Sequence, residues 1–336
     1  MRKPWFVIAG GGTGGHLYPG LVVAEAIRAA RPDVEITLFG TTRPIDEQLT
    51  AARNIKLVKQ EVQALPSKIT RWPSFLLAWR RSVKFAREQF AQRPPAVVLG
   101  WGGYAAGPPI VAAAKLGVPT AIFNPDAVPG RANKRLAPLV DRVFVQWEQT
   151  REHFPRARDV RRTGCPIRPA FGEVSKNLAI RSLKLHADRK VVLITGASQG
   201  AHSINAAILE LMDLWKKNPD WQILHLAGKA DLEFCTNRYR EAGVEARTVG
   251  YTEQMAHYMA AADLIISRAG ASTLAEISAV GVPAILMPYP YDRHKHQHAN
   301  ARVLEESHAA VIVEDSVNAA DNARRLAPAL ESLMRS

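Results

Sequence analysis

The stretch Trp5-Phe6-Val7-Ile8-Ala9-Gly10-Gly11-Gly12-Thr13-Gly14-Gly15-His16 decides how this chain begins to fold. The apolar run Trp5–Ala9 predicts a buried strand, and the amphipathic pattern over Leu21–Ala30 predicts a helix behind the turn. Glycines let backbone N–H groups approach a ligand, and a helix N-terminus favours an anion such as phosphate. This motif alone is also compatible with a tight strand-to-helix turn that binds no ligand. His16 could carry out proton chemistry near neutral pH at the rim of the turn.

The composition is that of a globular protein. The chain has 336 residues, enough for two ordinary domains, of which 47% are hydrophobic and 22% charged. It has no uncharged apolar run of about 18 residues that would predict a spanning helix. Cys165 and Cys235 predict two buried small residues rather than a disulfide framework, and they suit a reducing cytoplasm. The net charge of +13 indicates an anionic partner: nucleic acid, a phosphorylated substrate or an anionic membrane.

Strand patterns alternate with helical patterns along the whole chain. This alternation predicts parallel sheets with helices on both faces, and twelve strands are too many for one compact sheet. We therefore expect two doubly wound α/β domains, 1–165 and 166–318, that break in the turn-rich stretch Thr163–Pro169. A helix near 319–336 could pack back on the first domain. The expected strands are Phe6–Ala9, Glu35–Phe39, Lys56–Lys59, Ala96–Leu99, Pro119–Phe123, Arg142–Gln146, Lys190–Thr195, Gln222–Ala227, Ala246–Val249, Leu264–Ser267, Ala284–Pro288 and Ala310–Val313, and the expected helices include Ala201–Lys217 and Ser272–Val280.

Glycine-rich segments follow three of the predicted strands. They are Gly10–Gly15 and Gly100–Gly107 in the first domain and Gly196–Gly200 in the second. Because ligands of open parallel sheets bind outside the carboxyl ends of the strands, we expect all three segments around one cleft between the domains.

Two further segments carry polar groups that could bind a ligand. Ser267–Glu276 runs from a strand through a small-residue turn into a helix, a pattern that suits phosphate. Glu276 could then accept bonds from a ribose diol, or it could only complement the helix dipole. His294, His296 and His298 lack the i, i+4 spacing of a helical zinc site, so a polar ligand-contact loop is favoured over a metal site.

The segment Ser74–Phe90 predicts an amphipathic helix with two interpretations. Its apolar stripe has the spacing of a helix that faces the core, and we favour that for much of the stripe. The basic band beside it is typical of a helix on an anionic bilayer. Because apolar side chains at its start could turn outward, we expect Lys68–Arg81 to contribute to membrane docking. The stripe is Phe75, Trp79, Val83, Ala86 and Phe90; the candidate membrane residues are Trp72, Leu76, Leu77, Arg80, Arg81 and Lys84.

Several motifs, taken in order, resemble those of one family. They are Gly11–His16, Gly100–Pro108, Gly130–Lys134, Pro166–Arg168, Gly196–Ala201, Ser267–Glu276, Gly281–Pro283 and Gln297–Ala301. Over most of its length the chain resembles the MurG family of glycosyltransferases, in family 28. The resemblance implies a GT-B fold with two Rossmann-like domains facing a cleft. It also implies inverting transfer of N-acetylglucosamine from its UDP donor to the muramyl C4 hydroxyl of lipid I, which forms lipid II for peptidoglycan, by a protein peripheral to the cytoplasmic face of the bacterial plasma membrane.

The resemblance also implies roles for individual residues. Ser198 and the turn at Gly270–Ser272 would hold the diphosphate, Glu276 the ribose and Gln297 the sugar hydroxyls, while Arg168 would lie at the hinge. The family's donor contacts fall on Thr13, Gly14, Gly15, Arg168, Ser198, Thr252, Ala271, Ser272, Thr273, Leu274, Ala275, Glu276 and Gln297.

One segment departs from the family pattern. Where the family usually shows His-Glu-Gln-Asn, this chain has Phe123-Asn124-Pro125-Asp126. His16 is the first candidate for general base, and Asp126, which could also bind the sugar, is the second. The departure keeps open a related GT-B transferase with another acceptor, a sugar-nucleotide epimerase, and a UDP-sugar-binding protein with impaired catalysis.

The expected partners are the UDP-sugar, the polyprenyl-linked acceptor and an anionic membrane surface. We expect no metal or other cofactor, because no Asp-x-Asp pattern lies near the expected phosphates. We expect no nucleic acid, because the basic residues are spread along the chain and form no recognised nucleic-acid module.

Overall fold

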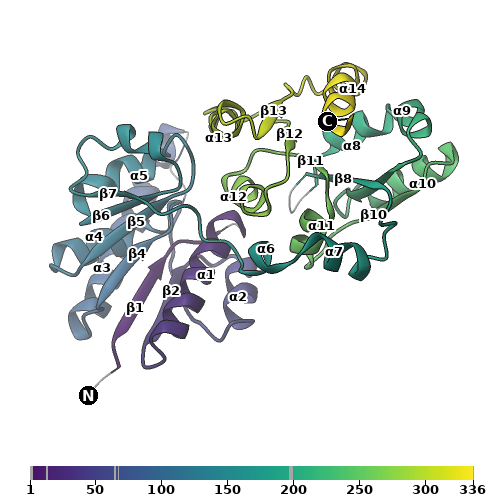
Figure 1. Ribbon diagram of the computed structural model, residues 1–336. Coiled ribbons are helices and arrows are strands. Elements are labelled where there is room, and N and C mark those ends of the chain that lie inside the picture. Colours follow the sequence, from purple (N-terminus) through teal and green to yellow (C-terminus); the bar gives the residue numbers. More distant parts are fainter. Residues whose placement is uncertain (1–2, 13, 64–65, 67, 197–199, 336) are drawn as a thin grey trace. The chain divides into compact units, whose positions relative to one another are not determined.

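The computed structural model describes residues 3–12, 14–63, 66, 68–196 and 200–335, and only the backbone of residues 14–16. The chain forms two units that divide between Ile167 and Arg168 (Figure 1), inside the turn-rich stretch Thr163–Pro169. In the described residues each unit holds one sheet in which all paired strands are parallel. The two doubly wound α/β sheets that the alternation predicted are therefore confirmed.

The first unit contains the strand that the opening stretch predicted, and it lies inside the sheet. Across the sheet the strands follow the order β3 (Lys56–Lys59), β2 (Glu35–Gly40), β1 (Trp5–Ala9), β4 (Val97–Gly100), β5 (Thr120–Asn124), β6 (Arg142–Val145) and β7 (Val160–Arg162). The helices are α1 (Gly14–Ala30), α2 (Pro44–Ala51), η1 (Ile69–Arg71), α3 (Trp72–Gln92), α4 (Gly107–Lys115), α5 (Arg131–Leu136), η2 (Ala137–Leu139) and η3 (Glu148–His153).

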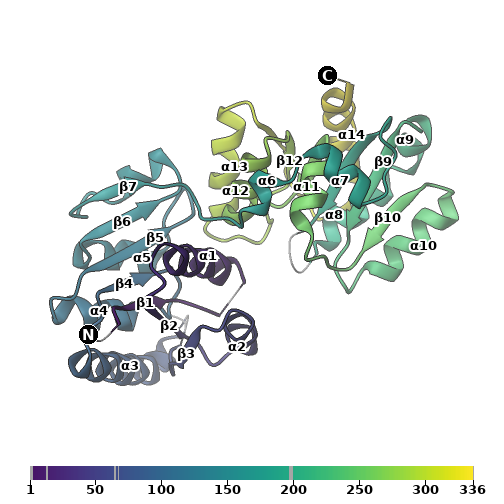
Figure 2. The ribbon, with the colours of Figure 1, turned by 60° about the horizontal axis from the view of Figure 1, so that its bottom comes forward.

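Strand β1 is apolar throughout because both of its faces are covered. Trp5, Val7 and Ala9 point into a core that α3 and α4 close. Ile8 points into a second core, which α1 closes from the other side of the sheet (Figures 1 and 2). A continuous apolar run is what a strand buried on both faces requires.

The second unit repeats this architecture with a different set of helices. Its strands follow the order β10 (Ala246–Val249), β9 (Trp221–Leu226), β8 (Lys190–Thr195), β11 (Leu264–Ser267), β12 (Ala284–Leu286) and β13 (Ala310–Ile312). The helices are α6 (Ala170–Glu173), α7 (Lys176–Ser182), α8 (His202–Leu209), α9 (Met212–Lys217), α10 (Leu232–Ala242), α11 (Met255–Ala261), α12 (Ala271–Val280), α13 (His296–Glu306) and α14 (Ala319–Arg335).

The C-terminal helix α14 belongs to the second unit. Its Leu326, Leu330 and Met334 are buried in the core formed with α8 and strand β8. The sequence had also allowed this helix to pack on the first domain. The apolar face of α14 is used within the second unit, since those three side chains complete that unit's core.

Three elements differ from their sequence predictions. Helix α1 begins at Gly14 rather than Leu21 and contains Pro19, so the last two glycines of the turn and His16 lie in its first turn. The helix predicted over Ala201–Lys217 is broken into α8 and α9, and the Trp215 indole donates to the Ile208 carbonyl at the break. Strand β7 had no sequence prediction; its short run Val-Arg-Arg gives little hydrophobic periodicity.

Strand order places the glycine turns within each unit. The chain leaves β1 and β4 at neighbouring positions where the order of strands reverses, and it leaves β8 and β11 at the equivalent place of the second sheet. Ligands of open α/β sheets bind at such switch points. None of the helices in the described part of the chain combines the length and apolarity needed to cross a bilayer.

Candidate functional site

In the first unit, the turns after β1 and β4 lie against each other. The Trp101 N–H donates to the Ala9 carbonyl at 2.7 Å, and a Cβ built on Gly10 would lie 3.1 Å from the Trp101 Cβ. Gly12 has a φ of +89°, which favours glycine because other residues are strained there. The glycines therefore serve close packing and an unusual backbone as well as any ligand.

The departing segment after β5 is largely interior. Phe123 is 2% exposed and stacks on Trp101 with ring centroids 4.6 Å apart and planes at 19°. Asn124 is also buried, and its amide donates to the Asp126 carbonyl at 2.6 Å. The side chains of Phe123 and Asn124 therefore pack inside the unit. Asp126 is half-buried at the end of the strand.

The Asn of the Gly130–Lys134 motif supports the same segment. The Asn133 amide nitrogen donates to the Phe123 carbonyl at 3.1 Å and to Asn124 Oδ1 at 3.0 Å. Its Oδ1 is buried without a hydrogen-bond partner among the residues that the structure describes. An unsatisfied buried oxygen costs about 1–3 kcal/mol, so this segment is held at some cost in stability.

In the second unit, predicted donor residues from distant parts of the sequence meet. Arg168 Nη2 lies 3.9 Å from Glu276 Oε1, and Arg168 Nη1 donates to the Glu253 carbonyl at 3.4 Å. Thr252 immediately precedes that carbonyl and accepts from the Gln254 N–H at 3.0 Å. Arg168, Thr252 and Glu276, three of the positions implied for the donor nucleotide, are therefore neighbours.

Glu276 has an environment that changes its acidity. Burial raises the pKa of Glu276 to about 7, and the nearby Arg168 guanidinium acts in the opposite direction. The carboxyl consequently changes its protonation state near neutral pH.

The amide of Gln297 holds the turn that precedes α12. Its Oε1 accepts from the Ala269 N–H at 3.2 Å and from the Tyr289 N–H at 3.0 Å. These two bonds fix the orientation of the Gln297 amide.

A buried ion pair ties the turn after β11 to the segment after β13, and Ser203 links the pair to the start of α8. Arg268 Nη1 donates to Asp315 Oδ2 at 2.7 Å, and Arg268 Nη2 donates to Ser203 Oγ at 2.7 Å. Arg268 Nη1 also donates to the Met287 carbonyl at 2.9 Å, and Asn322 donates to Asp315 at 2.8 Å.

The hydrogen-bond network around Asp315 lowers the pKa of its carboxyl. Burial raises the pKa of the Asp315 carboxyl, but hydrogen bonds from Ser203, the Val317 amide, Asn322 and Arg268 outweigh burial and hold the pKa below its ordinary value. The ionised carboxylate is therefore the form that the fold stabilises.

Several predicted residues are not placed in full. Thr13 and Ser198 lie outside the described residues, and Gly14, Gly15 and His16 are described by backbone alone. Of the three histidines, His298 Nε2 lies 2.5 Å from Glu314 Oε1, and the rings of His294 and His296 are in edge contact. Within the described residues, no cluster of three His, Cys, Asp or Glu side chains could hold a metal ion. Cys235 is buried as predicted, whereas Cys165 is half-exposed.

Different residues of helix α3 fit the two interpretations of its sequence. Phe75, Ala86 and Phe90 are buried, as predicted for a helix that faces the core. At the start of the helix Leu76 is 46% exposed and Leu77 51%. The candidate membrane side chains Arg80, Arg81 and Lys84 are also exposed, and Trp72 is half-buried.

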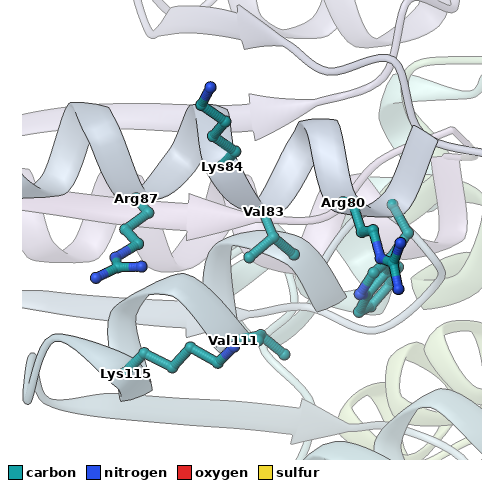
Figure 3. A pocket seen from close by; sticks show the side chains of 7 residues that line it. Arg80, Val83, Lys84, Arg87, Val111 and Lys115 are labelled. Atoms are coloured by element: carbon teal, nitrogen blue, oxygen red, sulfur yellow. The ribbon is translucent and has the colours of Figure 1, made fainter. Parts of the chain in front are cut away.

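A cationic groove runs along the surface between α3 and α4. It has a volume of about 350 Å³ and is lined by Trp79, Arg80, Val83, Lys84, Arg87, Val111 and Lys115. Figure 3 shows Arg87 reaching toward α4 and Lys115 lying along α4, whereas Lys84 points away from α4. Trp79 packs on Gly107, where an added Cβ would lie 2.3 Å from the indole.

The side chains that hold the turns from beneath could not be predicted from the sequence. In the first unit the Asp46 carboxylate accepts from the Gly12 N–H at 2.8 Å. In the second, Ser203 and Asp315 bind Arg268. Each partner comes from a different element, so no local spacing could have indicated it; only Arg268 lay within a quoted motif.

Two doubly wound parallel sheets with glycine turns at their switch points are the architecture of the GT-B fold, the class to which many glycosyltransferases belong. The crystal structure of Acinetobacter baumannii MurG matches with a TM-score of 0.78 and 26% identity, over 99% of this chain and 92% of that chain. The models of the glycosyltransferase family 28 N-terminal and C-terminal domains match residues 6–145 and 191–335.

The chain belongs to glycosyltransferase family 28. It is 36% identical to the UDP-N-acetylglucosamine--N-acetylmuramyl-(pentapeptide) pyrophosphoryl-undecaprenol N-acetylglucosamine transferase of Desulforamulus reducens, over 92% of this chain and 85% of that protein. It is 34% identical to the Bacillus subtilis protein of the same name, with the same coverage. A Listeria monocytogenes structure titled as a putative UDP-N-acetylglucosamine 2-epimerase, at 13% identity and TM-score 0.67, shares the fold alone.

Proposed function

We propose that this protein transfers N-acetylglucosamine from UDP-N-acetylglucosamine to the muramyl C4 hydroxyl of lipid I, with inversion, and so forms lipid II. The observation that carries the proposal is the 36% identity to a transferase with this donor and acceptor in its name, over 92% of the chain. The arrangement of Arg168 and Glu276 supports it, because two of the implied donor contacts lie together.

On the acceptor side, we assign His16 as the general base. In the transfer the base takes the proton of the C4 hydroxyl, the C4 oxygen bonds to the anomeric carbon, and the bond from that carbon to the diphosphate oxygen breaks. Proton transfer by a positioned side chain accelerates such reactions. Asp126, half-buried after β5, is the second candidate.

On the donor side, we assign the diphosphate to Ser198 and to the turn at Gly270–Ser272. Helix α12 begins at Ala271, and its N-terminus would stabilise the negative charge that UDP gains on leaving. Glu276 would accept the ribose hydroxyls, with Arg168 and Thr252 beside it. The Gln297 NH2 group would donate to a sugar hydroxyl.

Donor affinity is expected to depend on pH through Glu276. Ribose hydroxyls donate to the ionised carboxylate, so binding favours the deprotonated form. Since the folded pKa is about 7, the ionised fraction rises roughly tenfold between about pH 6 and pH 8, and the Kd for UDP-N-acetylglucosamine should fall by about that factor. Calorimetric titration at both pH values measures it. Glu276→Gln should bind with a flat pH profile; a slope that survives in this variant would assign the titration to another group.

A different acceptor is the second candidate function, and the departing segment favours it. Phe123 and Asn124 are buried, so they present no side chain where the family usually has His and Glu. A related GT-B transferase could then act on another lipid-linked or soluble sugar.

A transfer assay with labelled UDP-N-acetylglucosamine and purified lipid I tests the proposal. Labelled lipid II is the expected product. Transfer only to another acceptor would favour the second candidate, and donor binding without any transfer would identify a UDP-sugar-binding protein with impaired catalysis.

We also propose that the protein docks on the cytoplasmic face of the plasma membrane through Lys68–Arg81 and the start of α3. Exposed Leu76 and Leu77 lie beside the cationic groove, and apolar side chains flanked by cations bind anionic bilayers.

Charge reversal of the docking surface should weaken membrane binding. Each cation near an anionic surface contributes about 1 kcal/mol, so Arg80→Glu/Arg81→Glu/Lys84→Glu should lower the partition onto phosphatidylglycerol vesicles on the order of a hundredfold. The matched control, Lys216→Glu/Lys217→Glu/Arg238→Glu, changes the net charge equally at exposed positions of the second unit. Equal losses in both triple variants, or no loss in either, would contradict the docking surface.

A further inference from the structure

A buried carboxylate lies directly beneath the glycine turn of the first unit. Asp46, in the first turn of α2, is 0% exposed. Its Oδ1 accepts from the Gly12 N–H at 2.8 Å, and its Oδ2 accepts from the Thr41 N–H at 2.6 Å and from the Thr41 hydroxyl at 2.9 Å. Three donors on one carboxylate form a strong, directional attachment between α2 and the turn.

The glycines around Asp46 make room for this carboxylate. A Cβ on Gly11 would lie 2.2 Å from Asp46 Oδ2, and one on Gly40 would lie 2.9 Å from the same oxygen. The Asp46 carboxylate therefore leaves no room for a side chain at Gly11, and together with Leu57 Cδ1, 2.8 Å from such a Cβ, it leaves little room at Gly40.

Both ends of Gly12 are fixed. Its N–H is bound by Asp46, while its carbonyl accepts from Arg43 Nη1 at 2.7 Å. The Arg43 N–H in turn donates to the Thr41 hydroxyl at 3.2 Å, and that hydroxyl donates to Asp46. We call the contacts of Asp46 and Arg43 with Gly12 the clamp. Helix α1 begins at Gly14, so the clamp lies immediately before the turn of helix that carries His16. The Gly12 N–H is already used and does not point at a donor phosphate.

We propose that Asp46, assisted by Arg43, is a positioning residue for sugar transfer: its carboxylate fixes the Gly10–Gly12 turn and thereby the place of His16 relative to the acceptor hydroxyl. This inference rests on the proposed function, in which His16 is the base. It predicts an effect on the chemical step, because a misplaced catalytic group slows the reaction without loosening a donor that the second unit binds.

The variant Asp46→Asn tests the clamp with little change in volume. In either orientation of the amide, its NH2 group faces the N–H of Gly12 or of Thr41, so one backbone donor loses its acceptor. We expect kcat to fall on the order of tenfold to a hundredfold, with the KM for UDP-N-acetylglucosamine within about twofold of the unaltered chain.

The matched control is Thr50→Val in the same helix. It removes the bond from the Thr50 hydroxyl to the Asp46 carbonyl, at 2.7 Å, and leaves the three carboxylate bonds in place. Both variants should lower the melting temperature, but only Asp46→Asn should lower kcat by more than about twofold. Equal effects of the two variants on kcat would overturn the positioning role.

The double variant with His16→Ala separates this inference from the base assignment. If Asp46 acts through His16, the two losses of kcat are not additive, and full additivity would overturn the proposal. An undiminished kcat in His16→Ala would instead refute the base assignment. Should the unaltered chain transfer no sugar, amide hydrogen exchange decides: Asp46→Asn must speed exchange at Gly11–Gly12 and Thr50→Val must not, and equal exchange in both would refute the clamp itself.

Discussion

Replacing His16 by alanine is expected to lower kcat for transfer to lipid I by about a hundredfold to ten-thousandfold, the range that a positioned general base contributes. The KM for UDP-N-acetylglucosamine should stay nearly unchanged, because the donor contacts that we assign lie mainly in the second unit. Steady-state kinetics with labelled donor measure both constants.

Asp126→Asn is the companion variant for the choice of base. The amide keeps the shape of the side chain and loses its ability to take a proton. If His16 is the base, Asp126→Asn should retain most of the activity. The reverse result, with His16→Ala active and Asp126→Asn inactive, would transfer the role to Asp126.

Removing the Asp315 carboxylate is expected to lower the free energy of unfolding by about 3–5 kcal/mol, because Asp315→Ala leaves the buried Arg268 charge without its counter-ion. Chemical denaturation measures the loss. The folded pKa of Asp315 lies below its ordinary value. The stabilisation by the ionised form is therefore complete at neutral pH and declines as the pH falls through the acidic range. The difference in unfolding free energy between Asp315→Ala and the unaltered chain should therefore shrink as the pH falls.

Asp321→Ala is the matched control in the neighbouring helix α14. Asp321 pairs with Arg324 at the surface, with side chains 39% and 78% exposed. Exposed pairs contribute about 0–1 kcal/mol, so this variant should unfold almost like the unaltered chain. If Asp321→Ala lowered the free energy of unfolding as much as Asp315→Ala does, the buried pair would stabilise the fold no more than an exposed pair.

The order of strands and helices could be predicted because it depends on local patterns. The run Trp5–Ala9 is apolar at every position since both faces of β1 are covered, and the glycines after it mark where the chain turns. The errors fall where local pattern and tertiary contact disagree. Helix α1 starts before Pro19, and α8 ends early where the Trp215 indole caps the Ile208 carbonyl.

The candidate site was predictable only in the residues that lie within motifs. Arg168 was assigned from the family resemblance and Glu276 also from the pattern Ser267–Glu276, and the structure brings the two together. The departure from the family pattern at Phe123 and Asn124 could be read from the sequence, but only the structure shows that the Trp101 ring and the Asn133 amide hold these side chains inside. A list of motif positions does not tell which side of the strand is buried.

By itself, the sequence determined the two parallel sheets, the glycine turns at the ends of their strands, and the family. Only the tertiary structure decided what holds those turns. Gly12 and Asp46 are 34 residues apart, and Arg268 and Asp315 are 47 residues apart. Periodicity and turn chemistry act over a few neighbouring residues, whereas a buried carboxylate meets its donors only after separate elements have packed together.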